Sequence, residues 1–227
     1  MKIAVLGTGM VGRALAKRFA ETGHEVAVAT RDVEKTLARH EAGSMGTPPY
    51  SEWQQANPHI RLVPFAEAGR FAEVVVNATH GANSLPALEA VGGEALAGKV
   101  LIDLALPLDF SQGMPPKLLI ANTDSLGEQI QRAYPQARVV KTFNTMFCKV
   151  MVDPKSVPGP HNIFLAGDDE AAKQTVRQLL AEFGWSEDVM IDLGGIDGAR
   201  ATEMYMQLYF RLTGIIGFDF NIAVMRA

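Results

Sequence analysis

The sequence predicts an α/β protein built on an open, doubly wound parallel sheet with helices on both faces. Short, almost continuously apolar runs alternate along the first part of the chain with stretches whose apolar residues recur at helical spacing. Parallel strands need long crossovers, and strands buried on both faces carry unbroken apolar runs. The glycine-rich turn after the first run is a second indication, because it is typical of the opening unit of such a sheet.

The opening unit is a strand, a turn, a helix and a second strand. Residues 2–6 (KIAVL) are rich in strand formers, and residues 11–19 carry apolar side chains at helical spacing. Gly23 is expected to end that helix, and residues 25–29 (EVAVA) to form the next strand after a right-handed crossover. Further strands are expected at residues 61–64, 73–77, 99–103 and 138–141.

Between these strands, residues 44–58 are harder to interpret. Their Gly, Pro, Trp and Tyr content indicates a surface loop with a short helix. The segment either borders the ligand edge of the sheet or decorates the fold, and we favour decoration.

The pattern changes near residue 144, and we divide the chain into residues 1–143 and a small C-terminal α/β lobe of residues 144–227. In the lobe, a strand at residues 162–166 is expected to precede Asp168 as a helix N-cap, with Gly184 closing that helix. Residues 189–193 are expected to form one more strand.

A long terminal helix is expected from about residue 197 to residue 217. It is too apolar around its circumference for a solvated surface helix. We expect it in a core or in a contact between subunits, and we favour a homodimer contact.

Composition narrows the class of partner. The chain has 227 residues, 48% of them apolar, and its 21 Lys and Arg against 25 Asp and Glu give a net charge of -4. Without a basic run, no nucleic-acid partner is expected, and small molecules fit better. The N-terminal segment is read as strand and helix, not as a signal peptide, and no stretch predicts a membrane span. The single cysteine, Cys148, excludes an intramolecular disulfide framework, so we expect a cytoplasmic protein.

The turn GTGMVG matches the pattern G-x-G-x-x-G and predicts a dinucleotide site. Gly7 permits the tight turn, Gly9 lets a pyrophosphate approach the backbone, and Gly12 lets helix and strand pack closely. The phosphates then meet N–H groups at the positive end of the helix dipole. The predicted contacts at this turn are Gly7, Thr8, Gly9, Met10, Val11 and Gly12.

The stretch VATRD, at the end of the second predicted strand, indicates which dinucleotide is bound. A carboxylate at this position accepts hydrogen bonds from a ribose 2'-hydroxyl and repels a 2'-phosphate. Thr30 and Arg31 stand there instead, and Lys35 faces the same way if a helix begins near Asp32. Asp32 is interpreted as the N-cap of that helix. The pattern therefore favours NADP(H) over NAD(H).

In a doubly wound sheet the nicotinamide lies beyond the carboxyl ends of the central strands. Asn144 is the most suggestive polar residue there, because its amide can pair with the nicotinamide carboxamide. Capping the helix that follows is an equally open role for Asn144. The predicted contacts in this region are Asn77, Ala78, Thr79, His80, Ala105 and Asn144.

The chain offers neither a predicted metal site nor a predicted catalytic residue. The five histidines lack the spacing of a metal site, and His80 is read as ordinary and partly exposed. Cys148 follows Asn144 by one helical turn, but no base accompanies it, so a small core residue is the expected role.

With GTGMVG, VATRD, VVNAT, DLALPLD, VVKTFNTM and AGDDEAAK in this order, the sequence resembles the deazaflavin (coenzyme F-420)-dependent NADP oxidoreductase family over nearly its whole length. It is similar, more distantly, to the cytosolic reductase domain of transmembrane metalloreductases. The resemblance implies that Thr8, Thr30, Arg31 and Lys35 hold the 2'-phosphate and that the backbone of residues 9–12 holds the pyrophosphate. It also implies direct hydride transfer between NADP(H) and a deazaflavin, with the protein providing orientation instead of an acid or base.

The sequence departs from the family pattern on the acceptor side. Asn144 and Phe147 stand where the family has a histidine and a nearby proline, and Leu106 replaces an asparagine. The acceptor is therefore left open between a deazaflavin and another flavin-like molecule. Two alternatives stay beside this reading: an NADPH-dependent hydroxyacid or imine reductase, and a nonenzymatic NADPH sensor.

Overall fold

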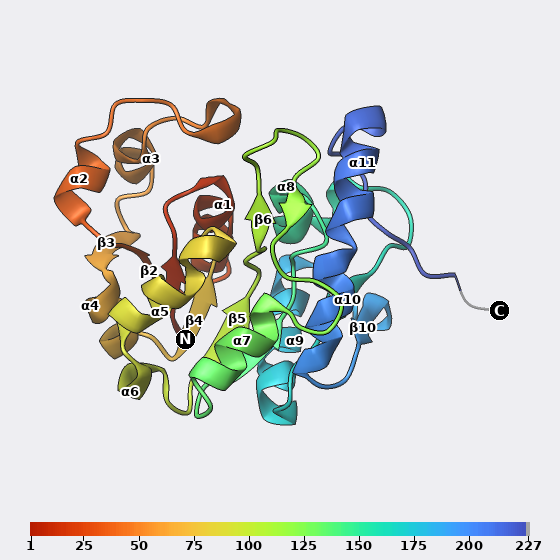
Figure 1. The fold of residues 1–227 in the computed structure, drawn as a ribbon. Coiled ribbons are helices and arrows are strands. Elements are labelled where there is room, and N and C mark those ends of the chain that lie inside the picture. The colour runs from red at the N-terminus through yellow and green to blue at the C-terminus, as the bar shows by residue number, and fades with distance from the viewer. Residues whose placement is uncertain (226–227) are drawn as a thin grey trace.

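The computed structural model describes residues 1–225, without the side chain of Ser44, and it contains the predicted parallel sheet (Figure 1). Six strands pair in the order β3-β2-β1-β4-β5-β8. Because the order reverses between β1 and β4, a crevice opens at their carboxyl ends. The bounds are β1 Lys2–Leu6, β2 Glu25–Thr30, β3 Arg61–Pro64, β4 Val74–Asn77, β5 Val100–Asp103 and β8 Arg138–Lys141.

Helices cover both faces of this sheet. The side chains of β1 alternate, so that Ile3 and Val5 enter one core while Ala4 and Leu6 enter the other. The first core is closed by α1, α8 and α9, and the second by α4 to α7. The helices are α1 Met10–Glu21, α2 Val33–Leu37, α3 Tyr50–Ala56, α4 Phe65–Phe71, α5 Ser84–Val91, α6 Gly93–Leu96, α7 Leu126–Ala133, α8 Cys148–Val152, α9 Glu170–Phe183, α10 Ala199–Met204 and α11 Met206–Ile216.

The C-terminal residues pack against the sheet as a continuation of the same body. A parallel pair, β9 (Ile163–Leu165) and β10 (Met190–Asp192), is bridged to β8 where Lys141 meets Ala166. Phe19 of α1 and Phe183 of α9 share one core, with ring centroids 4.7 Å apart. The proposed division at residue 143 therefore separates chain segments that share a core.

The N-cap predicted for α9 was wrong by one residue. Asp169, not Asp168, caps the helix, and its carboxylate accepts a hydrogen bond from the Ala172 N–H at 2.7 Å. Asp168 instead accepts from the Ile196 N–H at 2.9 Å. Gly184 closes the helix in the left-handed conformation, as predicted.

The long terminal helix is interrupted. The structure has α10 and α11 separated by Tyr205, which keeps helical dihedral angles. The Leu208 N–H bonds the Tyr205 carbonyl, three residues back, at 2.9 Å, so the helix tightens locally there. In Figure 1 this pair of helices lies at the end of the molecule opposite β3 and α2.

An antiparallel pair that the sequence did not predict follows β5. It consists of β6 (Leu108–Asp109) and β7 (Lys117–Leu118). The segment of residues 44–58 contains a short 3-10 turn, Ser44–Gly46, and the helix α3, in line with the expected loop and short helix. Within residues 1–225, no helix combines the length and the hydropathy that crossing a bilayer requires.

Candidate functional site: two cavities at the carboxyl edge of the sheet

The glycine turn has the geometry that its pattern predicts. Gly7 has a φ of 120°, and a Cβ there would lie 2.6 Å from the Ala78 carbonyl oxygen. A Cβ on Gly12 would lie 2.2 Å from the Gly7 carbonyl oxygen, so only glycine fits at either position. Gly9 is different, because a Cβ there would meet nothing within 4 Å. The backbone at Gly9 therefore faces open space at the start of α1, where a phosphate has room to approach.

A cavity of about 700 Å³ extends from this turn past the end of β2. It is partly enclosed and carries cationic side chains at the β2 end. Nine of the predicted contacts line it: Gly7, Thr8, Gly9, Thr30, Arg31, Lys35, Ala78, Thr79 and His80. We call this space the polar cavity.

Asp32, the carboxylate that lines the polar cavity, accepts a hydrogen bond from the backbone of α2. It caps the helix, accepting from the Lys35 N–H at 2.9 Å, and its second oxygen lies 3.2 Å from the Lys35 ammonium. These contacts, the backbone hydrogen bond foremost, lower the pKa of Asp32. The predicted N-cap is thus confirmed.

The Thr30 hydroxyl already has a partner. It lies 2.8 Å from the Thr36 hydroxyl, which in turn donates to the Asp32 carbonyl at 2.7 Å. Because Thr36 has a single hydroxyl proton, Thr30 is the donor in this pair. To donate to a phosphate, the Thr30 hydroxyl must rotate away from Thr36.

Arg39 is a cavity residue that the sequence reasoning missed. Its exposed guanidinium group lines the polar cavity together with Arg31 and Lys35. The spacing of four residues from Lys35 was the available signal. It was weak because α2 ends at Leu37, so Arg39 reaches the cavity from the loop beyond the helix.

A second cavity, of about 550 Å³, adjoins the first. We call it the apolar cleft, because its walls are largely methionine, leucine and aromatic side chains. They come from the glycine turn, the loops after β5 and β8, and α11. Met45 also lines the cleft, so the segment of residues 44–58 borders the ligand edge, and the decorative role favoured for it was wrong. The predicted contacts that line it are Met10, Val11, Ala78, Thr79, His80, Ala105 and Asn144.

The two cavities share one wall, the segment Ala78 to His80 that follows β4. The Thr79 hydroxyl donates to the Asn77 side-chain oxygen at 2.7 Å, which orients this wall. Gly81 packs against the neighbouring loop so closely that a Cβ would lie 2.1 Å from the Leu106 carbonyl oxygen. His80 is exposed, as expected, with its ring 6.2 Å from that of Phe110.

Two predicted contacts line neither cavity. Gly12 lies beneath the turn, and Asn77 is fully buried. The Asn77 amide donates to Asp103 at 2.8 Å and to Ser84 at 3.1 Å, so it supports the shared wall from below.

Asn144 is the most unusual polar group in the apolar cleft. It is only 2% exposed, and both polar atoms of its side-chain amide are buried without a hydrogen-bond partner. Phe143 beside it has a φ of 63°, a conformation that bulky residues rarely adopt. The helix that follows is capped by Phe147, so Asn144 is not its N-cap. Unsatisfied buried amide groups and backbone strain of this kind are features that cluster at ligand-binding positions.

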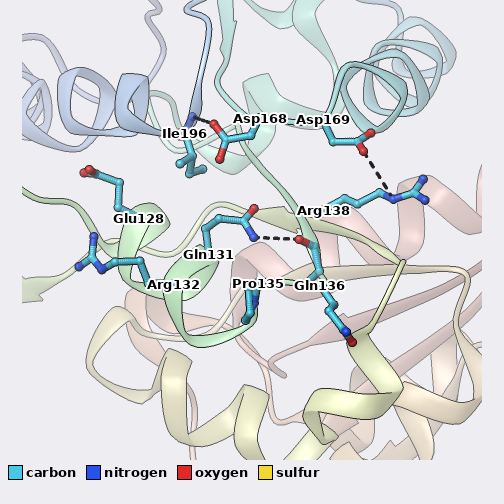
Figure 2. Close-up of a pocket in the computed structure, with 10 residues that line it drawn as sticks. Glu128, Gln131, Arg132, Pro135, Gln136, Arg138, Asp168, Asp169 and Ile196 are labelled. Carbon is cyan, nitrogen blue, oxygen red and sulfur yellow. Dashed lines mark hydrogen bonds and ion pairs between the residues drawn. The ribbon is translucent and has the colours of Figure 1, made fainter.

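Another cavity, of about 770 Å³, lies elsewhere, at the amino end of β8 (Figure 2). Its charged groups are engaged by protein partners. Arg138 lies 3.6 Å from Asp169, and Arg132 pairs with Asp124 at 2.8 Å. Glu128 pairs with Arg200. Size alone therefore does not make it the candidate site.

Within the described part of the chain, no cluster of His, Cys, Asp or Glu could hold a metal ion. Burial raises the pKa of the Cys148 thiol, which lines the apolar cleft as a neutral group.

The sheet order, the glycine turn and the polar cavity define a dinucleotide-binding protein of the doubly wound class. The family model for coenzyme F420-dependent NADP oxidoreductases matches residues 2–107. The F420-dependent NADP reductase of Methanothermobacter marburgensis is 30% identical over 218 residues, which cover 93% of this chain and 92% of that protein. The chain belongs to the F420-dependent NADP reductase family.

Two further relatives are a solved structure and a metalloreductase that matches in sequence. A crystal structure from Arthrobacter sp. FB24, described as a candidate F420-dependent NADP-reductase, is 52% identical, covers 100% of both chains and superposes with a TM-score of 0.94. The metalloreductase STEAP3 of Rattus norvegicus is 26% identical over 203 residues, which cover 89% of this chain and 36% of that protein.

Proposed function

We propose that this protein transfers a hydride between NADP(H) in the polar cavity and a deazaflavin or flavin-like acceptor in the apolar cleft. The observation that carries the proposal is the wall that the two cavities share, Ala78 to His80. A nicotinamide lying across this wall is within reach of a ring in the cleft.

On the nucleotide side, the residues present fit NADP(H). The open backbone at Gly9 gives the pyrophosphate access to the start of α1. Arg31, Lys35 and Arg39 supply positive charge for the 2'-phosphate, and Arg31 can bind it through two parallel hydrogen bonds. Asp32 caps α2 and pairs with the Lys35 ammonium, which partly offsets its negative charge.

On the acceptor side, the residues present fit a planar ring. Met146, Phe147 and Phe210 are among the side chains that surround the cleft with apolar area.

The buried amide of Asn144 offers donors and an acceptor that have no protein partner. An amide group of the same kind, such as the nicotinamide carboxamide, satisfies both at once.

When bound, the dinucleotide supplies the hydride, and this chain provides orientation and water exclusion. Proton transfer by a side chain is not required. Consistent with this division, Cys148 is neutral, and burial also raises the pKa of Tyr209, a cleft residue on α11.

We also infer a homodimer formed through α11. Leu208, Ile215 and Ile216 on this helix are between 55% and 78% exposed, which is unusual for large apolar side chains on one element. Sedimentation equilibrium at micromolar concentration tests the inference, and a monomer there would refute it. We place the protein in the cytoplasm, where its buried free thiol, Cys148, stays reduced, and we assign it no nucleic-acid partner.

The experiment that tests the proposed function is anaerobic mixing of the protein with NADPH and a panel of acceptors. Coenzyme F420, FMN, FAD and a ferric chelate are compared by the loss of reduced nicotinamide absorbance. We expect turnover with the deazaflavin or a flavin. Tight NADPH binding without oxidation by any of the four would instead support a sensor.

A further inference from the structure

The cluster of Lys141, Asp103 and Glu203 is the most deeply buried group of charges in the described chain, with exposures of 0%, 0% and 1%. The Lys141 ammonium lies 2.8 Å from a carboxylate oxygen of Asp103 and 2.8 Å from one of Glu203. It also donates to the Ala105 carbonyl at 2.5 Å. We call these three charged residues the Lys141 cluster.

Asp103 holds one wall of the apolar cleft. Its second oxygen accepts from the Ala105 N–H at 3.2 Å, while Lys141 binds the Ala105 carbonyl. Both polar backbone groups of Ala105 are therefore fixed by the cluster. Ala105 lines the cleft, and the chain continues from it directly into Leu106, which packs against Gly81 beside the shared wall.

Glu203 holds a second wall, the one that α11 forms. It lies at the end of α10, three residues before Met206, which begins α11 and lines the cleft. Its carboxylate also accepts from the N–H groups of Leu126 and Gly127 at 2.8 and 3.1 Å, at the start of α7. The terminal helices are thus fixed to the sheet through Glu203.

The cluster carries one net negative charge, from two carboxylates and one ammonium, in a place that water does not reach. Buried ion pairs contribute little net stability, because desolvation offsets their attraction, and apolar side chains of similar volume often do as well. A role in stability alone does not explain the position of these charges. They bind the backbone of Ala105 in one cleft wall and the helix that leads into the other wall.

We propose that Lys141 is a positioning residue that joins the two walls of the acceptor cleft, so that the acceptor ring and the nicotinamide meet at a fixed separation. The inference rests on the proposed function for the identity of the two ligands. The joining of the walls does not depend on that identity.

The variant Glu203→Gln tests the proposal. The amide keeps one oxygen, enough for one of the two N–H groups of α7, and removes the charge that faces Lys141. We expect kcat/KM for the acceptor to fall by at least about tenfold, because small misplacements of reacting groups cost much in rate, while the NADPH dissociation constant changes by less than about threefold.

Asp192→Asn is the matched control. Asp192 faces another buried ammonium, that of Lys173, at 2.9 Å, and Lys173 also binds Glu170. Neither cavity is lined by these residues. The control variant changes the same chemical group beside a buried lysine, and we expect it to leave the acceptor parameters as in the wild type.

Amide hydrogen exchange gives a readout that needs no substrate. We expect Glu203→Gln to speed exchange in peptides covering residues 104–108 and 205–210 together, and Asp192→Asn to leave both unchanged. Lys141→Gln, which removes the ammonium charge, is the second variant, and the same pattern is expected.

A folded Glu203→Gln or Lys141→Gln protein with wild-type exchange in both segments and wild-type acceptor kinetics would overturn the proposal. If the wild-type protein transfers no hydride at all, the proposed function fails, and the exchange experiment still decides whether Lys141 joins the two walls.

Discussion

Arg31 is the residue whose position most directly favours one dinucleotide over the other. It lines the polar cavity with Lys35 and Arg39, while Asp32 is held by the backbone of α2. A charged hydrogen bond contributes about 1.5 to 3 kcal/mol, so a single guanidinium can change affinity by one to two orders of magnitude. We therefore propose that side chains recognise the 2'-phosphate and that backbone groups recognise the pyrophosphate.

We expect Arg31→Glu to weaken NADPH binding by about ten- to a hundredfold and NADH binding by less than about threefold. Isothermal calorimetry with both nucleotides measures the two effects. Arg70→Glu is the control, because Arg70 is exposed, lines neither cavity and undergoes the same charge reversal. Equal losses for NADPH and NADH would show that Arg31 does not recognise the phosphate.

Asn144→Leu should raise stability and lower activity at the same time. The Asn144 amide is buried without a partner, and such groups cost about 1 to 3 kcal/mol, so an apolar residue of similar size should stabilise the protein by about 1 kcal/mol. Hydride transfer should slow by about tenfold because the ligand amide loses its partner. Chemical denaturation and steady-state kinetics measure the two changes.

Thr142→Val is the control for Asn144→Leu. The Thr142 hydroxyl is also buried without a partner, but Thr142 lines neither cavity. It should stabilise the protein without altering the kinetics. A stabilised Asn144→Leu protein with unchanged kinetics would remove Asn144 from the site.

At the scale of elements, the start of α7 shows how a short helix is held in place. Ser125 caps it by accepting from the Glu128 N–H at 3.1 Å, and Glu203 accepts from two further N–H groups. Asp124, just before the cap, forms two hydrogen bonds with Arg132 on the same helix, at 3.0 and 2.8 Å. Those bonds, with smaller contributions from neighbouring groups, lower the pKa of Asp124 to about 2.

This pKa predicts a pH dependence of stability. Because the folded-state pKa lies below the ordinary value of 3.8, the carboxylate stabilises the folded state above about pH 4, and this contribution is lost as the pH falls toward 2. The difference in unfolding midpoint between the wild type and Asp124→Asn should therefore shrink between about pH 5 and pH 3. A difference that stays constant over this range would contradict the role given to Asp124.

The order of the elements could be predicted from sequence much better than the ends and contacts of some of them. β1, β2, β4 and β5 are largely apolar runs whose burial on both faces leaves a clear pattern. All six strands lie where the sequence indicates, including β3, which is mostly exposed at the edge of the sheet. The N-cap of α9 was misplaced because Asp168 and Asp169 are both good caps. Only the fold shows that Asp168 is taken by the Ile196 N–H.

At the scale of the molecule, local patterns predicted the nucleotide side of the site and missed much of its support. The glycine turn and the basic pair lie within one strand-helix-strand unit, so their spacing in the sequence is enough to predict how they lie relative to each other. Asn77 was expected to contact the cofactor, but it supports the wall from below through Asp103. The Lys141 cluster brings together positions 103, 141 and 203. Contacts between residues so far apart in the sequence leave no local pattern from which they could be predicted.

The whole fold serves to place two ligands against one wall. Met206 and Tyr209 of α11 pack with Leu108 from the segment after β5, so α11 presents apolar side chains to the cleft at the sheet edge. A polar cavity suited to NADP(H) and an apolar cleft suited to a ring meet at Ala78 to His80. This arrangement predicts direct transfer between the ligands, without exchange with solvent.

The most direct test of this central claim uses NADPH carrying deuterium at the transferred position of C4, mixed anaerobically with the protein and oxidised coenzyme F420. Mass spectrometry of the reduced deazaflavin then follows the label. We expect the deuterium to appear at the deazaflavin C5. Reduced deazaflavin without deuterium at C5, or no reduction at all, would contradict direct transfer across the shared wall.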